Sequence, residues 1–350
     1  MQITKSRSRH NGLDIVRVIA VMFVSFAHFT YTAHHRTNIS GIHNSEVIVA
    51  NSEWAFLIPD QFLFLHFSTY LGTIGVALFF ITTGYLMPLM LERYTRKEFL
   101  LNRAFRIFPT LIVSVLITGG FVTWYYGEEF YTIQFLHSIF LTFQFWNIEP
   151  IIPVLWTLVT EIAFYLLCFI LGRFTHLKLM YGMGSVALVC FAAHFWHLGP
   201  LEYIIKYILI ILVGSVLYFL HTHEGNLWGN IGMLVTALLL WLIVFIYTEP
   251  TAPYSQPSTL VITMAIVLFF LFYPLKPLPC VAQLADIVYP LYLLHFTFGL
   301  TSMIIVKKFL SDNAYVMIVM AYIAVIGISF LVHYGVEKPF YFYIKQKLRR

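Results

Sequence analysis

Long apolar stretches, separated by short polar segments, run along the whole chain and set its predicted architecture. Ten of them come close to the ~20 residues that a helix needs to cross a bilayer core. They are residues 13–33, 68–90, 107–126, 154–172, 179–196, 203–220, 231–248, 259–274, 286–306 and 315–336. The pattern predicts an all-α, polytopic membrane protein of about ten transmembrane helices. No linker or charge block divides the chain, which indicates a single membrane domain over residues 1–350 with no appended soluble domain.

The composition supports a membrane protein rather than a soluble one. Of the 350 residues, 60% are hydrophobic and only 11% are charged, whereas soluble domains carry roughly 25% charged residues. The three cysteines show no CxxC spacing, and His34, His35 and His43 lack a dependable metal-ligand spacing. We therefore expect the lipid bilayer as the surroundings of the chain, and neither a metal site nor a nucleic-acid partner.

The distribution of lysine and arginine predicts how the helices are oriented. With the N-terminus inside, only four of the 21 Lys and Arg residues fall on the outer side: Arg36, Lys206, Lys307 and Lys308. Basic residues are enriched in the cytoplasmic segments of membrane proteins. Both termini are therefore predicted to be cytoplasmic, and the basic C-terminal tail is expected to lie on the anionic inner leaflet.

The first apolar stretch carries ionisable side chains, which a spanning helix tolerates only in a protein interior or a wet cavity. Asp14 and Arg17 lie near its start and His28 near its end. The eleven residues from Arg17 to His28 place both side chains on one helix face, ~16 Å apart along the axis. The stretch is predicted to supply a cation at the cytoplasmic end of a site and an imidazole at its outer half. The alternative for His28 is a core histidine that bonds a neighbouring helix.

A second cationic element precedes the third stretch. Arg103 and Arg106 are three residues apart, so their guanidinium groups share one face of a helix. Two such groups can hold phosphate oxygens from one side, and Arg17 is predicted at the same depth. Three arginines at one level suit a polyanionic ligand that enters from the cytosol. Anchoring of the membrane protein by basic inner loops is the alternative.

The fourth stretch contains a buried carboxylate. Glu161 is predicted to lie ~10 Å from the outer end, a depth close to that of His28. A carboxylate beside an imidazole fixes its tautomer and raises its basicity, so Glu161 is expected to orient His28. Thr157 and Tyr165 precede and follow Glu161 by four residues and are expected to satisfy its remaining lone pairs. The alternative is a structural pairing of Glu161 with another buried polar group.

Two further polar features lie near the C-terminus. The sequence Tyr-Pro-Leu-Tyr-Leu-Leu-His at 289–295 predicts a proline kink in the ninth stretch, with Tyr292 and His295 close to it. For these two residues a supporting, helix-bending role competes with a direct one. Glu337-Lys338-Pro339 is expected to end the last span at the cytoplasmic face, because proline stops a helix. A feature that caps this helix and docks on the membrane is the favoured alternative to a functional role.

Taken in order, these motifs resemble the acyltransferase 3 family of membrane O-acyltransferases. The family pattern starts with Arg or Lys, ten residues and His, which here are Arg17 and His28. It continues with Phe79–Tyr85 (where Thr83 stands for the family's Ser), Arg103–Pro109, Trp156–Tyr165, Tyr289–His295 and Glu337–Pro339. The resemblance covers essentially the whole chain, and the ordered set is far more specific than any single motif.

The resemblance implies ten spans, no permanently bound cofactor, and cytosolic acetyl-CoA (or another acyl-CoA) as co-substrate. The implied acceptor is a hydroxyl group of a cell-surface or lipid-linked glycan, and glycan-assembly proteins are compatible partners. The implied location is the plasma membrane, which is the inner membrane of a bacterium. The implied activity is that of an acetyl-CoA-dependent O-acetyltransferase.

The resemblance also assigns roles to the residues of the motifs. Arg17, Arg103 and Arg106 would bind the phosphates of the acyl-CoA, and the ~16 Å to His28 suits an extended pantetheine arm. His28 would act as general base, oriented by Glu161, and a transient acyl-histidine is the rival mechanism. Supporting positions are Asp14, Trp156, Thr157, Tyr165, Tyr292, His295 and Glu337. Trp156 also suits sugar stacking or an interfacial aromatic belt.

A proton-coupled transporter or exporter is the alternative function, because proton relays use the same intramembrane His, Glu and Arg residues. It explains neither the cluster of three arginines nor the order of the motifs. The sequence also shows no matching pair of Gly/Pro-broken helices of the kind that marks many transporters. A purely structural partner of glycan assembly is disfavoured by the buried charges.

Overall fold

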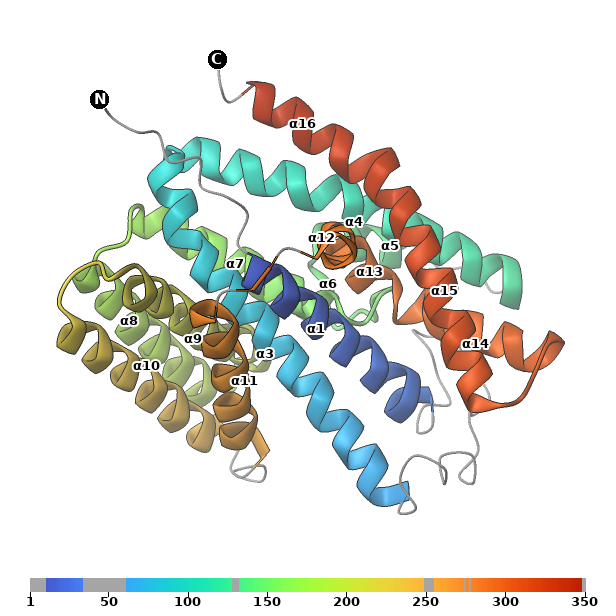
Figure 1. Ribbon diagram of the computed structural model, residues 1–350, viewed down its shortest axis with the longest axis horizontal. Helices are drawn as coiled ribbons and strands as arrows, with labels where there is room; N and C mark the ends of the chain where they lie inside the picture. The colour runs from blue at the N-terminus through green and yellow to red at the C-terminus, as the bar shows by residue number, and fades with distance from the viewer. Residues whose placement is uncertain are drawn as a thin grey trace.

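The computed structural model describes residues 11–33, 61–127, 132–248, 255–273, 275–276 and 278–347. Every regular element in this part of the chain is a helix, which confirms the predicted all-α class (Figure 1). The helices are α1 (Asn11–Ala27), η1 (His28–Thr32), α3 (Gln61–Arg93), α4 (Arg96–Tyr126), α5 (Thr132–Phe140), α6 (Phe143–Trp146), α7 (Leu155–Leu171), α8 (His176–Phe195), α9 (Gly199–Thr222), α10 (Leu227–Thr248), α11 (Ser255–Phe272), α12 (Pro279–Asp286), α13 (Val288–Leu294), α14 (Thr297–Phe309), α15 (Ala314–Val332), η2 (His333–Glu337) and α16 (Lys338–Lys347).

Seven of the described helices are long and apolar enough to cross a membrane. The pair α13 and α14, bent by 61°, counts as an eighth span, and the apolar helices Leu155–Leu171 and Ser258–Phe272 are shorter. The described part of each of the ten predicted stretches lies on a helix or on this bent pair. The protein is therefore a multi-pass membrane protein, whereas ten spans and cytoplasmic termini stay predictions.

Local sequence signals explain where several helices begin and end. At the start of α4 the Thr95 hydroxyl accepts the backbone N–H of Glu98, and the Glu98 carboxylate accepts the backbone N–H of Thr95. This capping box satisfies two of the N–H groups that a helix start leaves unpaired. Thr175 and Asn313 cap α8 and α15 by the same type of bond. α4 ends at Gly127, whose φ of 69° is accessible to glycine without steric cost.

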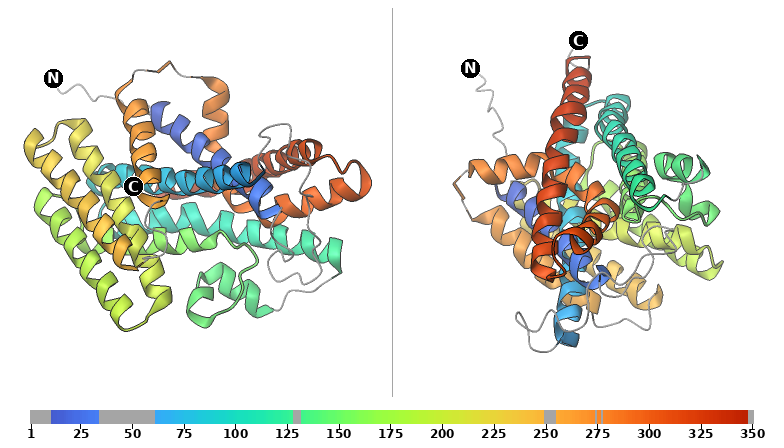
Figure 2. Two further views of the ribbon diagram at one scale, coloured as in Figure 1. Left: turned by 90° about the horizontal axis from the view of Figure 1, so that it is seen from below. Right: turned by 90° about the vertical axis from the view of Figure 1, so that its right-hand side faces the viewer.

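Helix α3 forms the centre of the molecule. It packs against α1 and against α9, while α11 contacts both α1 and α3. Helices α8, α9 and α10 pack alongside one another at one end of the molecule (Figures 1 and 2). Helices α13, α14 and α16 contact α4. Helices that are far apart in the sequence therefore surround one interior cavity. They include α1, α3, α4, α7 and α13.

The contact between α3 and α9 depends on two glycines that face each other. A Cβ at Gly84 would lie 1.7 Å from the carbonyl oxygen of Ile211, and a Cβ at Gly214 would lie 2.0 Å from that of Ile81. Ser215 also donates a hydrogen bond across the contact, to the carbonyl of Gly84, at 2.9 Å. Small residues that let backbones approach closely are typical of helix packing in membranes.

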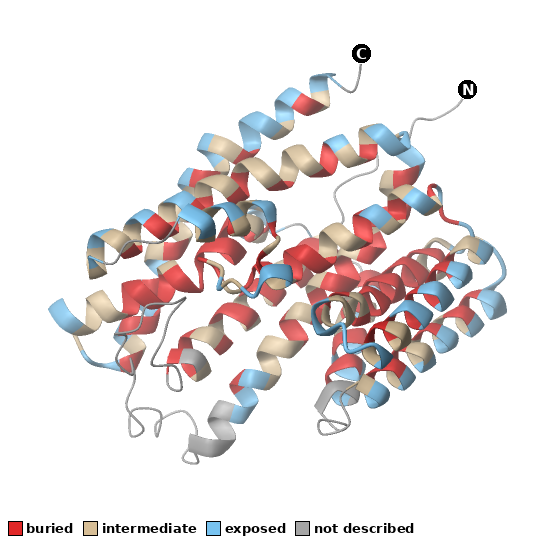
Figure 3. Cartoon of the chain, turned by 180° about the vertical axis from the view of Figure 1, so that it is seen from behind, coloured by how far each residue is buried: buried red, intermediate tan, exposed pale blue. Residues whose placement is uncertain are grey.

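The outer surface of the helices is rich in large apolar side chains. Trp124, Leu188 and Trp228 are each at least 70% exposed, and Figure 3 shows exposed positions along the outward sides of the helices. Water would make such a surface unfavourable, whereas lipid tails accept it. The exposed faces therefore agree with a bilayer environment.

The expected helix end at Pro339 is wrong. Helix α15 passes through the π-helical turn η2 and continues as α16, so that residues Ala314–Lys347 form one helical run. Pro339 is the second residue of α16, and the wider turn of η2 immediately before it interrupts the regular α-helical bonding. Proline is tolerated at such a helix start, because the missing N–H would have no partner within the new helix.

Replacing Gly84 or Gly214 by alanine is expected to destabilise the protein, because the new methyl group would meet backbone of the opposing helix. Overpacking of this kind costs about 3 kcal/mol, and separation of the two helices would add to it. Thermal unfolding in detergent measures the effect. Gly232→Ala is the matched control, since Gly232 lies on α10 with nothing within 4 Å of an added Cβ. Equal melting temperatures for all three variants would contradict the close contact.

Candidate active site

The helical run formed by α1 and η1 contributes side chains to two cavities. Arg17 lies in the α-helical part α1, whereas His28 is the first residue of the π-helix η1, a type of turn that often occurs at functional sites. Arg17 lines the larger cavity and His28 lines the smaller one. Asp14 lies 4.0 Å from Arg17 and is its ion-pair partner. Arg17 and His28, which the sequence predicts on one helix face, thus line different cavities.

The larger cavity, of about 810 Å³, lies between α1, α3, α4, α7, α9 and α13. It contains all three arginines that were predicted to share a site. Its charged lining residues are Arg17, Arg93, Arg103, Arg106, Glu92 and Glu161. Four arginines against two glutamates leave a formal excess of two positive charges, so the cavity favours an anionic ligand.

Arg103 is the most deeply buried of these arginines, with 8% of its surface exposed. Its Nη2 donates to the side-chain oxygen of Asn102 at 2.8 Å, and its guanidinium lies 5.8 Å from the ring centre of Tyr165. Its Nε has no hydrogen-bond partner, and no carboxylate of the described residues forms an ion pair with it. A buried cation that retains unused donors can bind a charged ligand without first breaking a salt bridge.

Glu161 lines the same cavity as Arg103. Its Oε1 accepts hydrogen bonds from the hydroxyls of Thr83, at 3.4 Å, and of Tyr165. The bond from Tyr165 confirms one of the predicted partners. Within the described part of the chain, Glu161 has no hydrogen bond to His28 and lines only the larger cavity.

The expectation that Glu161 orients His28 is therefore not met. The position of a residue along a helix gives its depth but not its direction around the axis. On α7 the two directions diverge: Trp156 lines the smaller cavity, whereas Thr157 and Glu161 line the larger one. Thr157 also differs from expectation, because its hydroxyl bonds the hydroxyl of Tyr292 at 2.8 Å rather than Glu161.

The smaller cavity, of about 360 Å³, contains His28 and is otherwise largely aromatic and apolar. Its aromatic lining residues are Tyr31, Phe80, Trp156, Tyr207, Trp241, Tyr292 and Phe296. His28 forms a hydrogen bond through Nδ1 to Nε2 of His295 at 2.8 Å. The two imidazole rings are stacked, with centroids 5.0 Å apart. His295 itself is fully buried.

The hydrogen bonds of His295 determine the tautomer of His28. A backbone carbonyl can only accept, so His295 Nδ1, 2.7 Å from the carbonyl of Tyr292, carries a hydrogen. In neutral His295 the other nitrogen, Nε2, is then an acceptor, and His28 donates to it from Nδ1. The neutral His28 ring consequently carries its lone pair on Nε2. His295 takes the orienting position that the sequence had assigned to Glu161.

A bend between two helices places His295 beside His28. The bend of 61° between α13 and α14 falls at His295 and Phe296, five residues beyond the expected kink at Pro290. The missing N–H of Pro290 acts earlier, because its partner in a continuous helix would be the carbonyl of Asp286. It thus accounts for the break between α12 and α13 rather than for the sharp bend.

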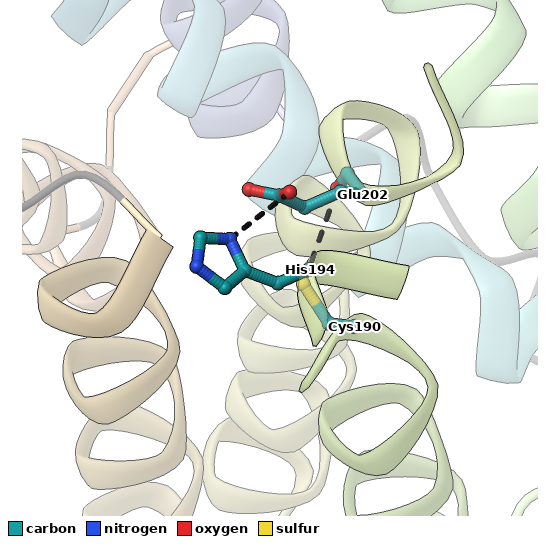
Figure 4. Close-up of polar contacts among 3 residues, drawn as sticks. All are labelled: Cys190, His194 and Glu202. Atoms are coloured by element: carbon teal, nitrogen blue, oxygen red, sulfur yellow. Dashed lines mark hydrogen bonds and ion pairs between the residues drawn. The ribbon is translucent and has the colours of Figure 1, made fainter. Parts of the chain in front are cut away.

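Two other polar pairs are not among the residues that line either cavity. Glu337 accepts from His333 Nδ1 at 2.8 Å within η2 and contributes no lining side chain. His194 and Glu202 bond at 3.1 Å and join the end of α8 to the start of α9, beside Cys190 (Figure 4). Both pairs are ties between or within helices.

Several lining residues carried no usable signal in the sequence. Val76 and Trp241 lie within apolar helices and outside every motif, where nothing distinguishes a cavity wall from packing. Asn102, by contrast, is a polar residue that directly precedes Arg103 and is buried. Because a buried amide needs a hydrogen-bond partner, its position in the sequence could have indicated a contact with Arg103.

The fold and the two cavities define an all-helical membrane protein with an arginine-lined cavity next to a histidine-containing one. The family model described as an acyltransferase domain matches residues 10–334, and the chain is a member of the acyltransferase 3 family. The protein is therefore a multi-pass membrane member of that family.

Among curated proteins, nodulation protein 10 of Rhizobium leguminosarum bv. viciae is similar to this chain. The two are 27% identical over 185 residues, which cover 46% of this chain. The match spans only 44% of that relative's own length. No solved structure gives a significant match to the chain.

The tautomer of His28 is directly measurable. We expect ¹⁵N NMR of histidine-labelled protein to show His28 protonated at Nδ1 and unprotonated at Nε2, because His295 accepts from Nδ1. The spectrum of His28→Gln assigns the signal by its loss. In His295→Leu the preference for this tautomer should disappear, whereas a protonated Nε2 in the unaltered protein would contradict the arrangement.

Proposed function

We propose that this protein is a membrane O-acetyltransferase that moves the acetyl group of cytosolic acetyl-CoA to a hydroxyl group of a cell-surface or lipid-linked glycan. The observation that carries the proposal is the arginine-lined cavity directly beside the cavity that contains His28. Membership of an acyltransferase family supports this function over a proton-coupled transporter.

The larger cavity is the proposed site for the donor. CoA carries phosphate groups at its nucleotide end, and arginine binds phosphate through two parallel hydrogen bonds. Arg17, Arg103 and Arg106 would hold these groups, at the end of the molecule that the distribution of basic residues predicts to be cytoplasmic. CoA is a co-substrate in this scheme, and no permanently bound cofactor is invoked.

Glu161 is proposed to bind the middle of the donor rather than to assist His28. Its carboxylate is fixed by Thr83 and Tyr165 and lines the larger cavity. The pantetheine arm contains two amide N–H groups, for which a fixed carboxylate is a good acceptor. This contact would align the arm so that the thioester points away from the arginines and toward the smaller cavity.

His28 is the proposed general base. Its Nε2 would take the proton of the acceptor hydroxyl as the oxygen attacks the thioester carbonyl. The bond from carbonyl carbon to sulfur then breaks, CoA leaves as the thiolate, and the proton passes from His28 to the thiolate. His295 would hold the tautomer throughout and stabilise the imidazolium through its neutral Nε2.

The smaller cavity is the proposed site of the acceptor. Trp156, Tyr207 and Trp241 line it, and aromatic rings provide apolar surfaces against which the faces of sugars stack. The acceptor would arrive from the outer side of the plasma membrane, the inner membrane in a bacterium. Glycan-assembly proteins would then be the natural partners.

Loss of the imidazole at position 28 is expected to abolish transfer. Membrane vesicles from the producing cells contain the native acceptor, so labelled acetyl-CoA should introduce base-labile label into their glycans. His28→Ala should lower this rate by about 10²-fold or more, the usual contribution of a general base. Mass spectrometry of protein quenched with acetyl-CoA distinguishes a base from an acyl-histidine intermediate.

The control for His28→Ala is His197→Asn. His197 is exposed and has a φ of 55°, a conformation that asparagine tolerates, so its replacement should leave transfer unchanged. Unaltered transfer by His28→Ala would refute the role of His28. Failure of the unaltered protein to transfer acetyl from acetyl-CoA would refute the proposed function itself.

Substitution of Arg103 is expected to weaken CoA binding. Arg103→Lys keeps the charge but loses the planar pair of donors, and the dissociation constant of CoA should rise by about tenfold or more. Isothermal titration of the purified protein with CoA measures this. Arg96→Lys is the matched control, because Arg96 is exposed and lines neither cavity. Equal affinities of the two variants would contradict the assignment.

A further inference from the structure

The two cavities share three lining side chains. Val76 and Phe80 of α3 and Tyr292 of α13 line both the larger and the smaller cavity. Val76 and Phe80 are four residues apart and therefore lie one above the other on one face of α3. We call these three side chains the partition, because among the described residues they are the ones that line both cavities.

The two aromatic members of the partition are held in place from several directions. Phe80 is 3% exposed and packs edge-on against Trp156, with ring centroids 6.2 Å apart. Tyr292 packs against Phe79 at 5.2 Å, and its hydroxyl bonds Thr157 at 2.8 Å. Rotation of either ring would break these contacts, so both rings form fixed walls.

Val76 differs from these rings. It is only half-buried and is the smallest side chain of the three. With two walls fixed, the size of residue 76 sets how wide a group can pass between the cavities. A substitution at this position can therefore widen or narrow the passage without moving the rings.

The partition lies on the route of the acyl group. Arg103 lines the larger cavity only and His28 the smaller cavity only. A donor bound by its phosphates at Arg103 reaches His28 only if its acyl end passes Val76, Phe80 and Tyr292. This step rests on the function proposed above.

We propose that Val76, Phe80 and Tyr292 form a size filter that admits the acetyl group and excludes longer acyl chains, with Val76 as the position that sets the limit. In a close-packed passage each extra methylene of the acyl chain needs room that fixed walls do not provide. Discrimination by a single methylene in an apolar site typically lies between about 10-fold and 200-fold. The filter would thus act on the donor before any contact with the acceptor.

Substitution at position 76 tests the filter with two changes of opposite sign. Val76→Ala should raise the rate of butyryl transfer relative to acetyl transfer by about tenfold, measured with labelled acetyl-, butyryl- and hexanoyl-CoA on the vesicles that carry the native acceptor. Val76→Phe should abolish transfer of all three. Binding of adenosine 3′,5′-bisphosphate, which lacks the pantetheine arm, should persist in both variants and show that they are folded.

The matched controls are Val235→Ala and Val235→Phe. Val235 lies on α10, is 48% exposed and lines neither cavity, so the same exchanges there should leave the acyl preference unchanged. An unchanged preference in Val76→Ala, or acetyl transfer retained by Val76→Phe, would overturn the filter while the proposed function stands. No transfer from any acyl-CoA by the unaltered protein would overturn both.

Discussion

The hydrogen bond between His28 and His295 is the contact on which the site depends. It joins the first helix of the chain to a bend between α13 and α14, 267 residues away. Both residues lie where regular α-helix is interrupted. His28 is the first residue of η1, and His295 lies in the bend between α13 and α14. Through the carbonyl of Tyr292 the bond also fixes which nitrogen of His28 carries the lone pair. Two departures from regular α-helix therefore position one imidazole.

In a bilayer, the free-energy cost of a buried polar group depends on whether that group has a hydrogen-bond partner. A polar group buried among apolar helices is costly unless another group satisfies it. His295 is buried and satisfied at both nitrogens, and Glu161 accepts from two hydroxyls. Arg103 differs from both, because its buried Nε has no hydrogen-bond partner and the residue lines the larger cavity. The difference separates groups that already have partners from one that is prepared for a ligand.

The division into two cavities suits a reaction whose two substrates come from opposite sides of a membrane. Charge is concentrated in the larger cavity and aromatic surface in the smaller one. The partition of Val76, Phe80 and Tyr292 keeps the spaces apart. A donor with a long flexible arm can then present its acyl group across the partition while its charged end stays behind.

The sequence predicted the elements of the fold well and the contacts of the site less well. The apolar length of a segment is a local property of the sequence, so the helices could be predicted from it. The spacing and depth of Arg17, Arg103 and Arg106 likewise predicted their shared cavity. The partner of His28 did not, because the direction of Glu161 around α7 is decided by long-range packing against α3 and α4. The helix end at Pro339 failed for a similar reason, since η2 packs against α4 and lets the helix continue. Wall residues such as Trp241 were hidden among equally apolar neighbours.

The proposed donor spans both cavities, and a structure with a bound donor analogue would show whether it does. Cryo-electron microscopy of the protein with a thioether analogue of acetyl-CoA, which cannot transfer its acyl group, would locate each part of the molecule. We expect phosphates beside Arg17, Arg103 and Arg106, and the acyl carbonyl next to Nε2 of His28. A nucleotide bound outside the arginine-lined cavity, or an acyl group that stays on the Glu161 side of the partition, would contradict it.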